Sequence, residues 1–276
     1  MDKLYIVCVL YNKKVEEISS LSTFLYFVDK YDSVRLKIMD NSSEAIAAEN
    51  RETCETVYKN RITYTCSGGN IGLSKAYNKA LDEIEDDTFY VMWSDDDTTF
   101  SKEYIGNVLK MIKLGRSDII AGIIMTKNGV LSPAAALSPL LIKSRKKFIQ
   151  KPGLYNNIYC INSGLTIKNT VFDAVGRYDE ELFLDAVDHL FCDKLIDKGI
   201  NRIAIVPGDI MQDYSGQTND LPARKKRLRI LMRDWLKWKK ISQRHTVFIY
   251  LFLLSEIRSL LKAVLKNTTA KVIDGK

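Results

Sequence analysis

Apolar residues follow two different patterns along the first half of the chain. Short unbroken apolar runs, such as Leu4–Tyr11 (LYIVCVLY), are typical of strands that are buried on both faces of a parallel sheet. Between these runs lie longer segments in which apolar residues recur every three or four positions, as Val15, Ile18 and Leu21 do, and this spacing predicts amphipathic helices. The two patterns alternate from residue 4 to about residue 125.

This alternation predicts an α/β fold with a mostly parallel sheet that is flanked by helices and joined by right-handed crossovers. Strands are expected at residues 4–11, 34–40, 61–65, 88–94, 117–125, 158–169 and 201–209. Helices are expected at residues 15–31, within 41–60, and at 71–84, 102–115 and 185–200. From Thr126 to Gly153 the pattern fails and three of the five prolines occur, so we expect a mobile or substrate-facing loop with a short helix.

Polar side chains stand at the ends of three expected strands. Tyr11 and Asn12 end or follow the first strand, Asp40 ends the second, and the triplet Asp95–Asp97 follows the strand at 88–94. Ligands of doubly wound sheets bind beyond the carboxyl ends of the strands. We therefore expect these three clusters to meet at one edge of the sheet.

The three consecutive aspartates repel one another, and in a partly dry site this repulsion needs a compensating positive charge. Asp95 and Asp97 can offer two oxygen ligands to a hard divalent cation, Mg²⁺ or Mn²⁺, which would bridge to substrate phosphates. A solvated acidic turn is the alternative that the triplet alone leaves open.

Two further segments carry candidate chemistry. In CSGGNIGLSKAYNKAL, glycines precede a helix, so the backbone can approach a phosphate or a sugar; the GxGxxG spacing is absent, and a plain turn fits equally well. In LDAVDHLFCDKL, the spacing predicts Asp185 as the N-cap of a helix and Asp188 as its third residue. A carboxylate at the latter place, near the sheet edge, can also act as a general base.

Six motifs, in this order along the chain, resemble the family 2 glycosyltransferases, which have the Rossmann-like GT-A fold. They are VCVLYN, IMDNSSE, GGNIGLSKAYNKAL, WSDDDTT, INSGLTIK and YDEELFLDAVDHLFCDKL. The subgroup that the chain most resembles is the bacterial rhamnosyltransferase-like enzymes of surface polysaccharide synthesis. The resemblance covers about residues 3–215 and includes the later segment QDYSGQTND.

This resemblance implies a metal-dependent, inverting transferase. It would move a sugar from a nucleotide-diphosphate donor, dTDP-rhamnose or a UDP-sugar, to a glycan acceptor that we expect to be lipid-linked. On the donor side, Asp40 would contact the nucleotide base, with Tyr11 and Asn12 beside it. The other implied residues are Asn70 and Gly72 for the nucleotide, Asp95 and Asp97 for the metal with Asp96 between them, and Ser163 and Gly164 near the donor sugar and acceptor.

The resemblance makes Asp188 the catalytic base. Val187 stands where many members of the family have Glu or Asp, as it does in the rhamnosyltransferase-like subgroup. Only one carboxylate of the usual pair is therefore present, and Asp185 remains a competitor for the role. In the implied mechanism the base takes the proton of an acceptor hydroxyl, whose oxygen attacks the anomeric carbon in line.

Composition argues against several kinds of site. The five cysteines are scattered without a CxxC pair and there are only two histidines, which argues against a disulfide framework and against a zinc or multi-histidine site. Hydrophobic residues make up 46% of the chain, enough for a sizeable core. The N-terminal sequence has neither the basic region nor the cleavage site of a signal peptide, so we expect a cytoplasmic protein.

The net charge of +7 is concentrated near the C-terminus. Arg224–Lys240 contains nine Lys or Arg residues and one Asp, so the rest of the 276-residue chain is nearly neutral. We therefore expect a GT-A catalytic domain at residues 1–221 and a basic amphipathic helical tail at residues 222–276. Nucleic acid is not an expected partner, because no recognised reading motif accompanies the charge.

The tail has the features of a helix that lies in a membrane interface. Trp235 and Trp238 fall on the apolar face of the basic helix, and the apolar run Thr246–Leu254 is too short to span a bilayer. We expect peripheral binding to the anionic inner face of the plasma membrane. A helix pair that packs on the catalytic domain or in a homodimer is the alternative.

Two other functions remain open on the sequence alone. Asp95, Asp97 and Thr99 fit the D-x-D-x-T motif of Mg²⁺-dependent phosphatases of the haloacid-dehalogenase type, although that motif typically follows the first strand. The second is a non-catalytic protein that binds a nucleotide sugar and docks to a membrane.

Overall fold

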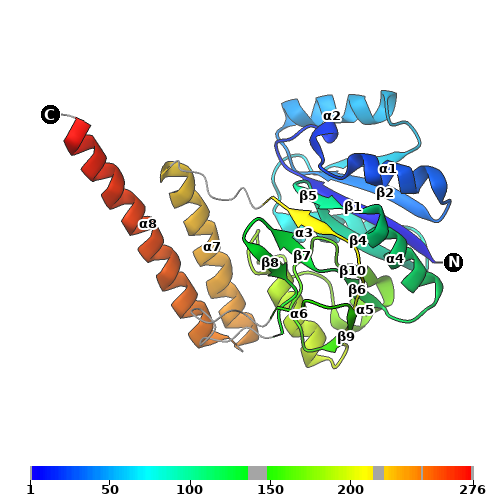
Figure 1. Cartoon of the computed structure of the whole chain (residues 1–276). Helices are drawn as coiled ribbons and strands as arrows, with labels where there is room; N and C mark the ends of the chain where they lie inside the picture. Colours follow the sequence, from blue (N-terminus) through cyan, green and yellow to red (C-terminus); the bar gives the residue numbers. More distant parts are fainter. Residues whose placement is uncertain (1, 136–147, 214–220, 244, 275–276) are drawn as a thin grey trace.

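A sheet of eight strands forms the centre of the protein body (Figure 1). The structure is a computed structural model and describes residues 2–135, 148–213, 221–243 and 245–274, with side chains as far as residue 264. In spatial order the strands are β3 (Ile62–Cys66), β2 (Val34–Asp40), β1 (Lys3–Leu10), β4 (Phe89–Asp95), β10 (Thr166–Lys168), β6 (Ile119–Ala121), β11 (Arg202–Ile205) and β9 (Gly153–Asn156). The first four are parallel, and β10 and β9 run antiparallel to their neighbours.

A smaller sheet of four strands has the order β5 (Thr98–Phe100), β12 (Ile210–Gln212), β7 (Ile124–Thr126) and β8 (Gly129–Ser132). The single strand that we expected over residues 117–125 is wrong, because the chain leaves the large sheet after β6 and enters the small one as β7. The change falls at Gly122, where a Cβ atom would lie 2.4 Å from the Ile210 side chain and 2.7 Å from the Tyr104 ring. Strand β8 occupies the start of the expected loop, of which residues 136–147 lie outside the described part of the chain.

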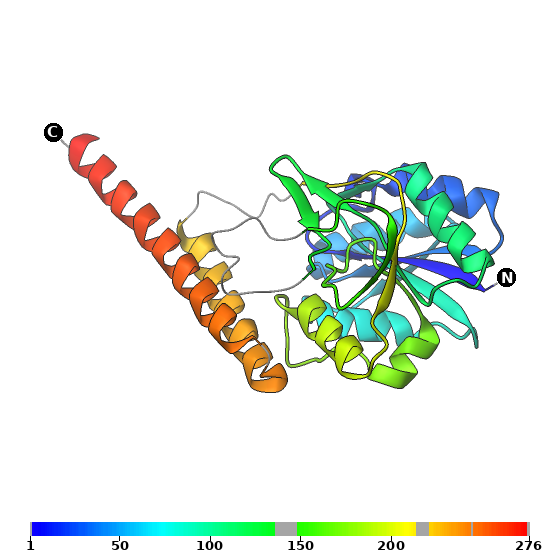
Figure 2. The same ribbon diagram turned by 60° about the horizontal axis from the view of Figure 1, so that its bottom comes forward.

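Helices cover both faces of the large sheet (Figure 2). Those on one face are η1 (Val15–Glu17), α1 (Leu21–Lys30), α2 (Glu44–Thr56) and α4 (Lys102–Lys113), and those on the other are α3 (Leu73–Asp82), α5 (Asn169–Val175) and α6 (Val187–Asp197). Side chains of strand β1 pack into both layers. Ile6 and Cys8 belong to the hydrophobic cluster on the face that carries α1 and α4, whereas Val7 and Val9 belong to the cluster on the face that carries α3, α5 and α6. This alternation explains why β1 reads as an unbroken apolar run.

Two long helices at the C-terminus form an antiparallel hairpin, with α7 (Leu221–Ser242) lying between α8 (Thr246–Asp274) and the body (Figure 1). Trp235 and Trp238 are buried, at 6% and 0% exposure. The Trp238 ring lies 5.2 Å from the His189 ring of α6, and the Trp235 ring stacks at 4.0 Å on Phe252 of α8. The hairpin therefore shares a hydrophobic cluster with the body.

This packing corrects one expectation about the tail. The two tryptophans do not face a membrane, since they fill the space between α6, α7 and α8. The packed helix pair, which the sequence left open, is the arrangement observed. Within the described residues, neither long helix has the length and apolar character needed to cross a bilayer. The division into domains at residues 1–221 and 222–276 stays a prediction.

Candidate active site

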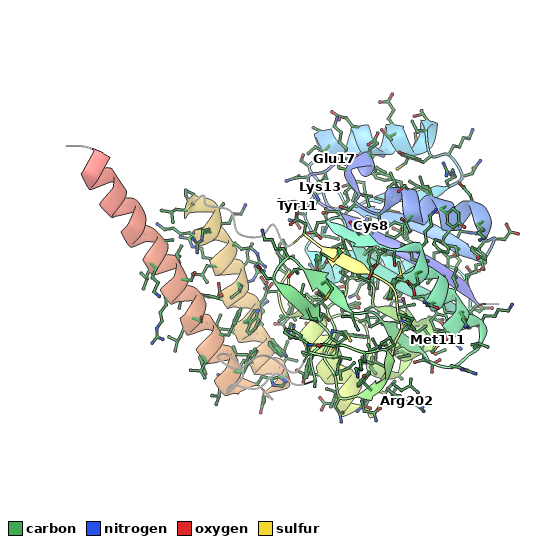
Figure 3. All side chains as sticks on the ribbon, viewed as in Figure 1. Cys8, Tyr11, Lys13, Glu17, Met111 and Arg202 are labelled. Atoms are coloured by element: carbon green, nitrogen blue, oxygen red, sulfur yellow. The ribbon has the colours of Figure 1, made fainter. Side chains whose placement is uncertain are left out.

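The three polar clusters predicted at strand ends do meet at one edge. In the parallel register Leu10 of β1 lies beside Asp40 of β2, and Val9 lies beside Asp95 of β4. Figure 3 shows Tyr11 and Lys13 just beyond the end of β1, on the side of the body that faces α7. The Tyr11 side chain is 48% exposed there. The edge thus combines an exposed aromatic ring with carboxylates on β2 and β4, the two strands that flank β1.

The aspartate triplet is compensated by residues from other segments. Lys13 binds Asp96 at 2.6 Å. Asp95 and Asp97 instead converge on one amide, because Gln212 Nε2 donates to Asp95 Oδ2 at 3.0 Å and to Asp97 Oδ1 at 3.4 Å. Burial, and then the charge of Asp97, raise the pKa of Asp95 to about 7. Burial and the charge of Asp96 also raise the pKa of Asp97.

The residues around this amide fit a hard divalent cation. Gln212 Oε1 is buried without a hydrogen-bond partner among the described residues, so turning the amide would aim a third oxygen at the point where the two carboxylates converge. Carboxylate and amide oxygens are ligands that such cations accept. No group of three or more His, Cys, Asp or Glu in the described part of the chain could hold a metal ion, so Gln212 and substrate oxygens would have to complete the site.

Gln212 was not among the candidates from sequence. It lies on β12, a strand of three residues whose place beside β5 depends on long-range pairing. The motif QDYSGQTND begins at this residue and was the only pointer to it.

Asp40 supports the edge from inside the protein. Its carboxylate is fully buried and accepts hydrogen bonds from the backbone N–H of Ser42 at 2.8 Å, from Asn50 at 2.7 Å and from Tyr64 at 2.9 Å. The Ser42 hydroxyl in turn accepts from the N–H of Asn12 at 2.8 Å. Asp40 therefore fixes the turn beside Asn12, and its own oxygens are already occupied by protein groups.

The glycine loop, which we define as residues 67–72 between β3 and α3, is held on two sides. Asn70 Oδ1 accepts from the N–H of Gly72 at 3.0 Å, and Asn41 Nδ2 donates to the Gly72 carbonyl at 3.3 Å. On the other side, the Phe183 carbonyl accepts from the N–H of Leu73 at 2.6 Å. Gly72 has φ +89°, and a Cβ atom there would lie 2.7 Å from the Phe183 ring. The loop thus needs glycine for its conformation and for this contact.

Ser163 and Gly164 lie against the aspartates but make protein contacts. The Ser163 hydroxyl accepts from the N–H of Asp95 at 3.2 Å and lies 2.8 Å from the Thr98 hydroxyl oxygen. The N–H of Gly164 donates to the Trp93 carbonyl at 2.7 Å. These two residues therefore fix the end of β4 in place.

The two candidate base residues have different surroundings. Helix α6 begins at Val187 with Ala186 as its N-cap, so the prediction of Asp185 as the cap is wrong. Asp185 instead forms a two-point ion pair with Arg227 of α7. Burial raises the pKa of Asp185, although the Arg227 guanidinium opposes this.

Asp188 lies in the first turn of α6, with 19% of its side chain exposed. Its Oδ1 accepts from the backbone N–H of His189 at 2.8 Å and lies 2.7 Å from the ring Nδ1. Burial alone would raise the pKa of Asp188, but the charge and hydrogen bonds of His189 outweigh it and hold this pKa below its usual range. Asp188 is thus favoured as an ionised carboxylate.

The charge of Asp188 acts on Asp95 at the end of β4. The charge of Asp188 contributes to the raised pKa of Asp95, after burial and the charge of Asp97. The hydroxyl of Tyr77 is buried without a partner among the described residues, and after burial both Asp95 and Asp188 raise its pKa. Three elements, β4, α3 and α6, therefore place polar groups near the same region, and Tyr77 had not been predicted from sequence.

Comparison with known proteins identifies the family of the chain. Residues 8–175 match the model of the family described as glycosyl transferase family 2. The chain is 23% identical over 206 residues to the dTDP-rhamnosyl transferase RfbF of Shigella flexneri, and the alignment covers 74% of this chain and 66% of that protein. The chain thus spans just under two thirds of the length of this curated relative.

Solved structures give the fold. GalNAc-T7, crystallised with UDP, GalNAc and Mn²⁺, is 14% identical with a TM-score of 0.59, and the match covers 86% of this chain and 49% of that one. Residues 1–349 of TarS from S. aureus are 15% identical with a TM-score of 0.53, covering 84% of this chain and 65% of that one. These likenesses identify the GT-A fold.

A methyl group at Gly72 should destabilise the protein through Phe183. Gly72→Ala forces a positive φ on alanine and also pushes Cβ into the Phe183 ring and carbonyl. Gly176→Ala is the matched control, because its φ of +82° and ψ of +166° are close to the +89° and +165° of Gly72, but no atom lies within 4 Å of the new Cβ. We expect the control to cost about 1–3 kcal/mol of backbone strain and Gly72→Ala about 1–3 kcal/mol more from overpacking. Urea unfolding of both variants measures the difference, and equal losses would contradict the contact.

Proposed function

The chain belongs to glycosyl transferase family 2, and from this premise we propose that it is an inverting glycosyltransferase that moves a sugar from a nucleoside diphosphate to a hydroxyl group of a glycan. The observation that carries the proposal is the convergence of Asp95 and Asp97 at the carboxyl edge, with Asp188 near enough to raise the pKa of Asp95. The likeness to RfbF favours dTDP-rhamnose as the donor, and the GalNAc-T7 structure with UDP keeps a UDP-sugar as the second candidate.

We assign the donor nucleotide to the edge formed by β1, β2 and the glycine loop. Tyr11 and Asn12 follow the end of β1, and Asn70 and Gly72 form the opposite wall. Asp40 would shape this place through the Ser42 turn, because its carboxylate is enclosed by protein donors. Asp96, Ser163 and Gly164 would support the donor site by holding the end of β4.

Asp95, Asp97 and Gln212 would hold Mg²⁺ or Mn²⁺, which when bound neutralises charge on the diphosphate leaving group. The chain's own contribution is to bring one oxygen of Asp95 and one of Asp97 together, and a third oxygen would come from Gln212 once its amide has turned. Lys13 meanwhile neutralises the middle carboxylate, Asp96, and so limits the repulsion within the triplet.

In the proposed reaction Asp188 accepts the proton of the acceptor hydroxyl. A bond forms between the acceptor oxygen and the anomeric carbon as the bond from that carbon to the diphosphate oxygen breaks, so the configuration inverts. His189 keeps Asp188 ionised and oriented through its N–H and its ring. Asp185 is less suited to this role, because Arg227 occupies both of its oxygens.

The alternatives from sequence are weaker on this fold. A phosphatase of the haloacid-dehalogenase type carries its nucleophile after the first strand, whereas Asp95 ends β4 behind three strand–helix units. A non-catalytic protein that binds nucleotide sugars stays the second candidate. Incubation with dTDP-rhamnose and with UDP-sugars in the presence of Mn²⁺ separates the two, since only an enzyme releases the nucleoside diphosphate.

We also propose that the protein binds the anionic cytoplasmic face of the plasma membrane peripherally, through the outer face of α8. Four apolar side chains on that face are each more than 40% exposed: Val247, Leu251, Leu254 and Leu261. They recur at helical spacing, and Arg258 and Lys262 fall at the same spacing beside them. An apolar stripe with cations matches an anionic lipid surface, where a lipid-linked acceptor would be presented.

Removal of Asp97 should abolish metal-dependent nucleotide binding while the fold survives. Titration calorimetry of UDP and dTDP, with Mn²⁺ and with EDTA, compares Asp97→Ala with the wild type. Asp86→Asn is the control, since Asp86 binds Lys3 and Tyr5 at the amino-terminal end of β1. Full transferase activity of the wild type in EDTA would rule out the metal site.

Asp188→Asn should lower the turnover rate by roughly two to four orders of magnitude, the usual contribution of a positioned base. Asparagine keeps the size of the side chain but cannot take the proton, so donor affinity should hardly change. Single-turnover kinetics with the donor in excess measures the chemical step. If Asp185→Asn eliminates turnover and Asp188→Asn does not, Asp185 is the base.

Charge on the outer face of α8 should weaken vesicle binding. We expect Leu251→Glu combined with Leu254→Glu to lower partitioning onto anionic vesicles by about tenfold or more, because apolar contact is lost and lipid phosphates repel the new charges. Leu154→Glu on β9, where Leu154 is 50% exposed, is the control. Co-sedimentation of full-length chains is the measurement, because a cut near Leu221 would uncover the cluster around Trp238.

Binding of the wild type should also fall with added salt. Equal partitioning of the double variant and the wild type would refute binding through α8. A change in the oligomeric state of the double variant, without a change in partitioning, would assign the stripe to a homodimer.

A further inference from the structure

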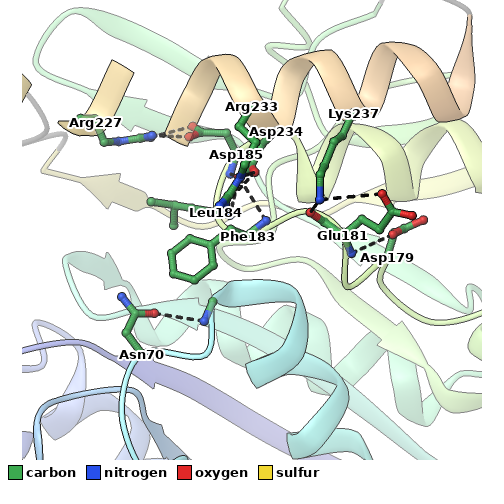
Figure 4. A network of polar contacts seen from close by, with 11 residues as sticks. Asn70, Asp179, Glu181, Phe183, Leu184, Asp185, Arg227, Arg233, Asp234 and Lys237 are labelled. Atoms are coloured by element: carbon green, nitrogen blue, oxygen red, sulfur yellow. Dashed lines mark hydrogen bonds and ion pairs between the residues drawn. The ribbon is translucent and has the colours of Figure 1, made fainter. Parts of the chain in front are cut away.

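A short loop before α6 connects three functional parts of the molecule. We call residues 181–186 the bridging loop. It contacts the glycine loop on one side and α7 on the other, and it leads into the helix that carries Asp188 (Figure 4). Nothing in the reaction described above explains why a helix of the tail should touch it.

The strongest contact in this region comes from Asp234 of α7. Its side chain is fully buried, and its Oδ2 accepts hydrogen bonds from three consecutive backbone N–H groups: Phe183 at 3.1 Å, Leu184 at 2.7 Å and Asp185 at 3.0 Å. Its Oδ1 accepts from Arg233 at 3.0 Å. Backbone N–H groups outside helices and strands need such acceptors when they are shielded from water. One carboxylate thus fixes the course of three residues.

Two more residues of α7 bind the same loop. Arg227 pairs with the Asp185 side chain, and Lys237 donates to the Glu181 carbonyl at 2.8 Å. Arg227, Asp234 and Lys237 are separated by seven and three positions, which puts them on one face of the helix. This face is distinct in function from the tryptophans, which pack on α6 and α8.

The position of the bridging loop determines the positions of two neighbouring segments, the glycine loop and the first turn of α6. The Phe183 carbonyl accepts from the N–H of Leu73, and the Phe183 ring covers Gly72, so the loop sets the glycine loop. At its other end, Ala186 caps α6, whose first turn carries Asp188. A displacement of Phe183–Asp185 would therefore move the proposed donor wall and the proposed base relative to each other.

We propose that Asp234 is a positioning residue: it holds the bridging loop so that Asp188 and the glycine loop keep the relative positions that the reaction needs. The proposal rests on the proposed function for the roles of Asp188 and Gly72. It makes the tail a part of the active site, in addition to any contact with a membrane.

A second buried carboxylate provides the control. Asp193 of α6 accepts from Trp238 Nε1 at 2.7 Å, from the Ser242 hydroxyl at 2.6 Å and from the Tyr159 hydroxyl at 2.7 Å. It fastens the hairpin to the body without touching the bridging loop. Asp193→Asn therefore loosens the C-terminal end of α7 around Trp238 and Ser242, whereas Asp234→Asn loosens the bridging loop.

The first readout is hydrogen exchange, which does not depend on any activity. In full-length Asp234→Asn, the amides of Phe183, Leu184, Asp185 and Leu73 should exchange faster than in the wild type. In Asp193→Asn these four amides should stay protected while the C-terminal end of α7 exchanges faster. Unchanged protection in Asp234→Asn, or an equal loss in both variants, would overturn the proposal even if the chain proved not to be a transferase.

The second readout is kinetic. Asp234→Asn should lower kcat by about 10- to 100-fold, as expected for a misplaced reacting group, and should weaken donor binding. Asp193→Asn should lose less kcat at an equal or greater loss of thermal stability. With donor saturating, the double variant Asp234→Asn/Asp188→Asn should lose clearly less turnover than the product of the two single losses, because part of the effect of Asp234 acts through the base.

Independent, multiplying losses in the double variant would overturn the positioning role of Asp234. An Asp188→Asn variant with wild-type turnover would instead overturn the proposed base, and the exchange result would then stand by itself.

Discussion

Three adjacent carboxylates at the end of β4 impose the constraint on which the rest of the site depends. Each must be compensated, and none of the compensating groups is a neighbour in sequence. Lys13, which binds Asp96, comes from the turn after β1, and Gln212, which donates to Asp95 and Asp97, comes from β12. The parallel register of β1 and β4 and the pairing of β12 with β5 are what bring these groups together.

The spacing of apolar residues predicted the elements that are long enough to show a pattern within their own sequence. Strands β1, β2 and β4 are buried on both faces, so continuous apolar runs identified them almost to the residue. Short strands such as β5 and β12 have three residues each, too few for a period, and their existence depends on distant partners. For the same reason the sequence could not show that one apolar run, residues 117–125, serves two sheets.

The candidate site divides in a similar way. Residue types at strand ends predicted which edge would carry the chemistry, since carboxyl ends of parallel strands must coincide. Sequence could not show that Asp185 pairs with Arg227, 42 positions away, or that both oxygens of Asp40 accept hydrogen bonds from protein groups. The tail gives the clearest case: an apolar stripe predicts a helix but not what covers it, and Trp235 and Trp238 are covered by the chain itself.

The three N–H groups of Phe183–Asp185 have a consequence for how such chains can be recombined. These three donors belong to the body, whereas the carboxylate that accepts from them belongs to α7. A chimaera that joins this body to the tail of a relative keeps the three N–H donors but not the Asp234 carboxylate. A tail can therefore be exchanged without loss of these three hydrogen bonds only for one that presents an acceptor at the position of Asp234.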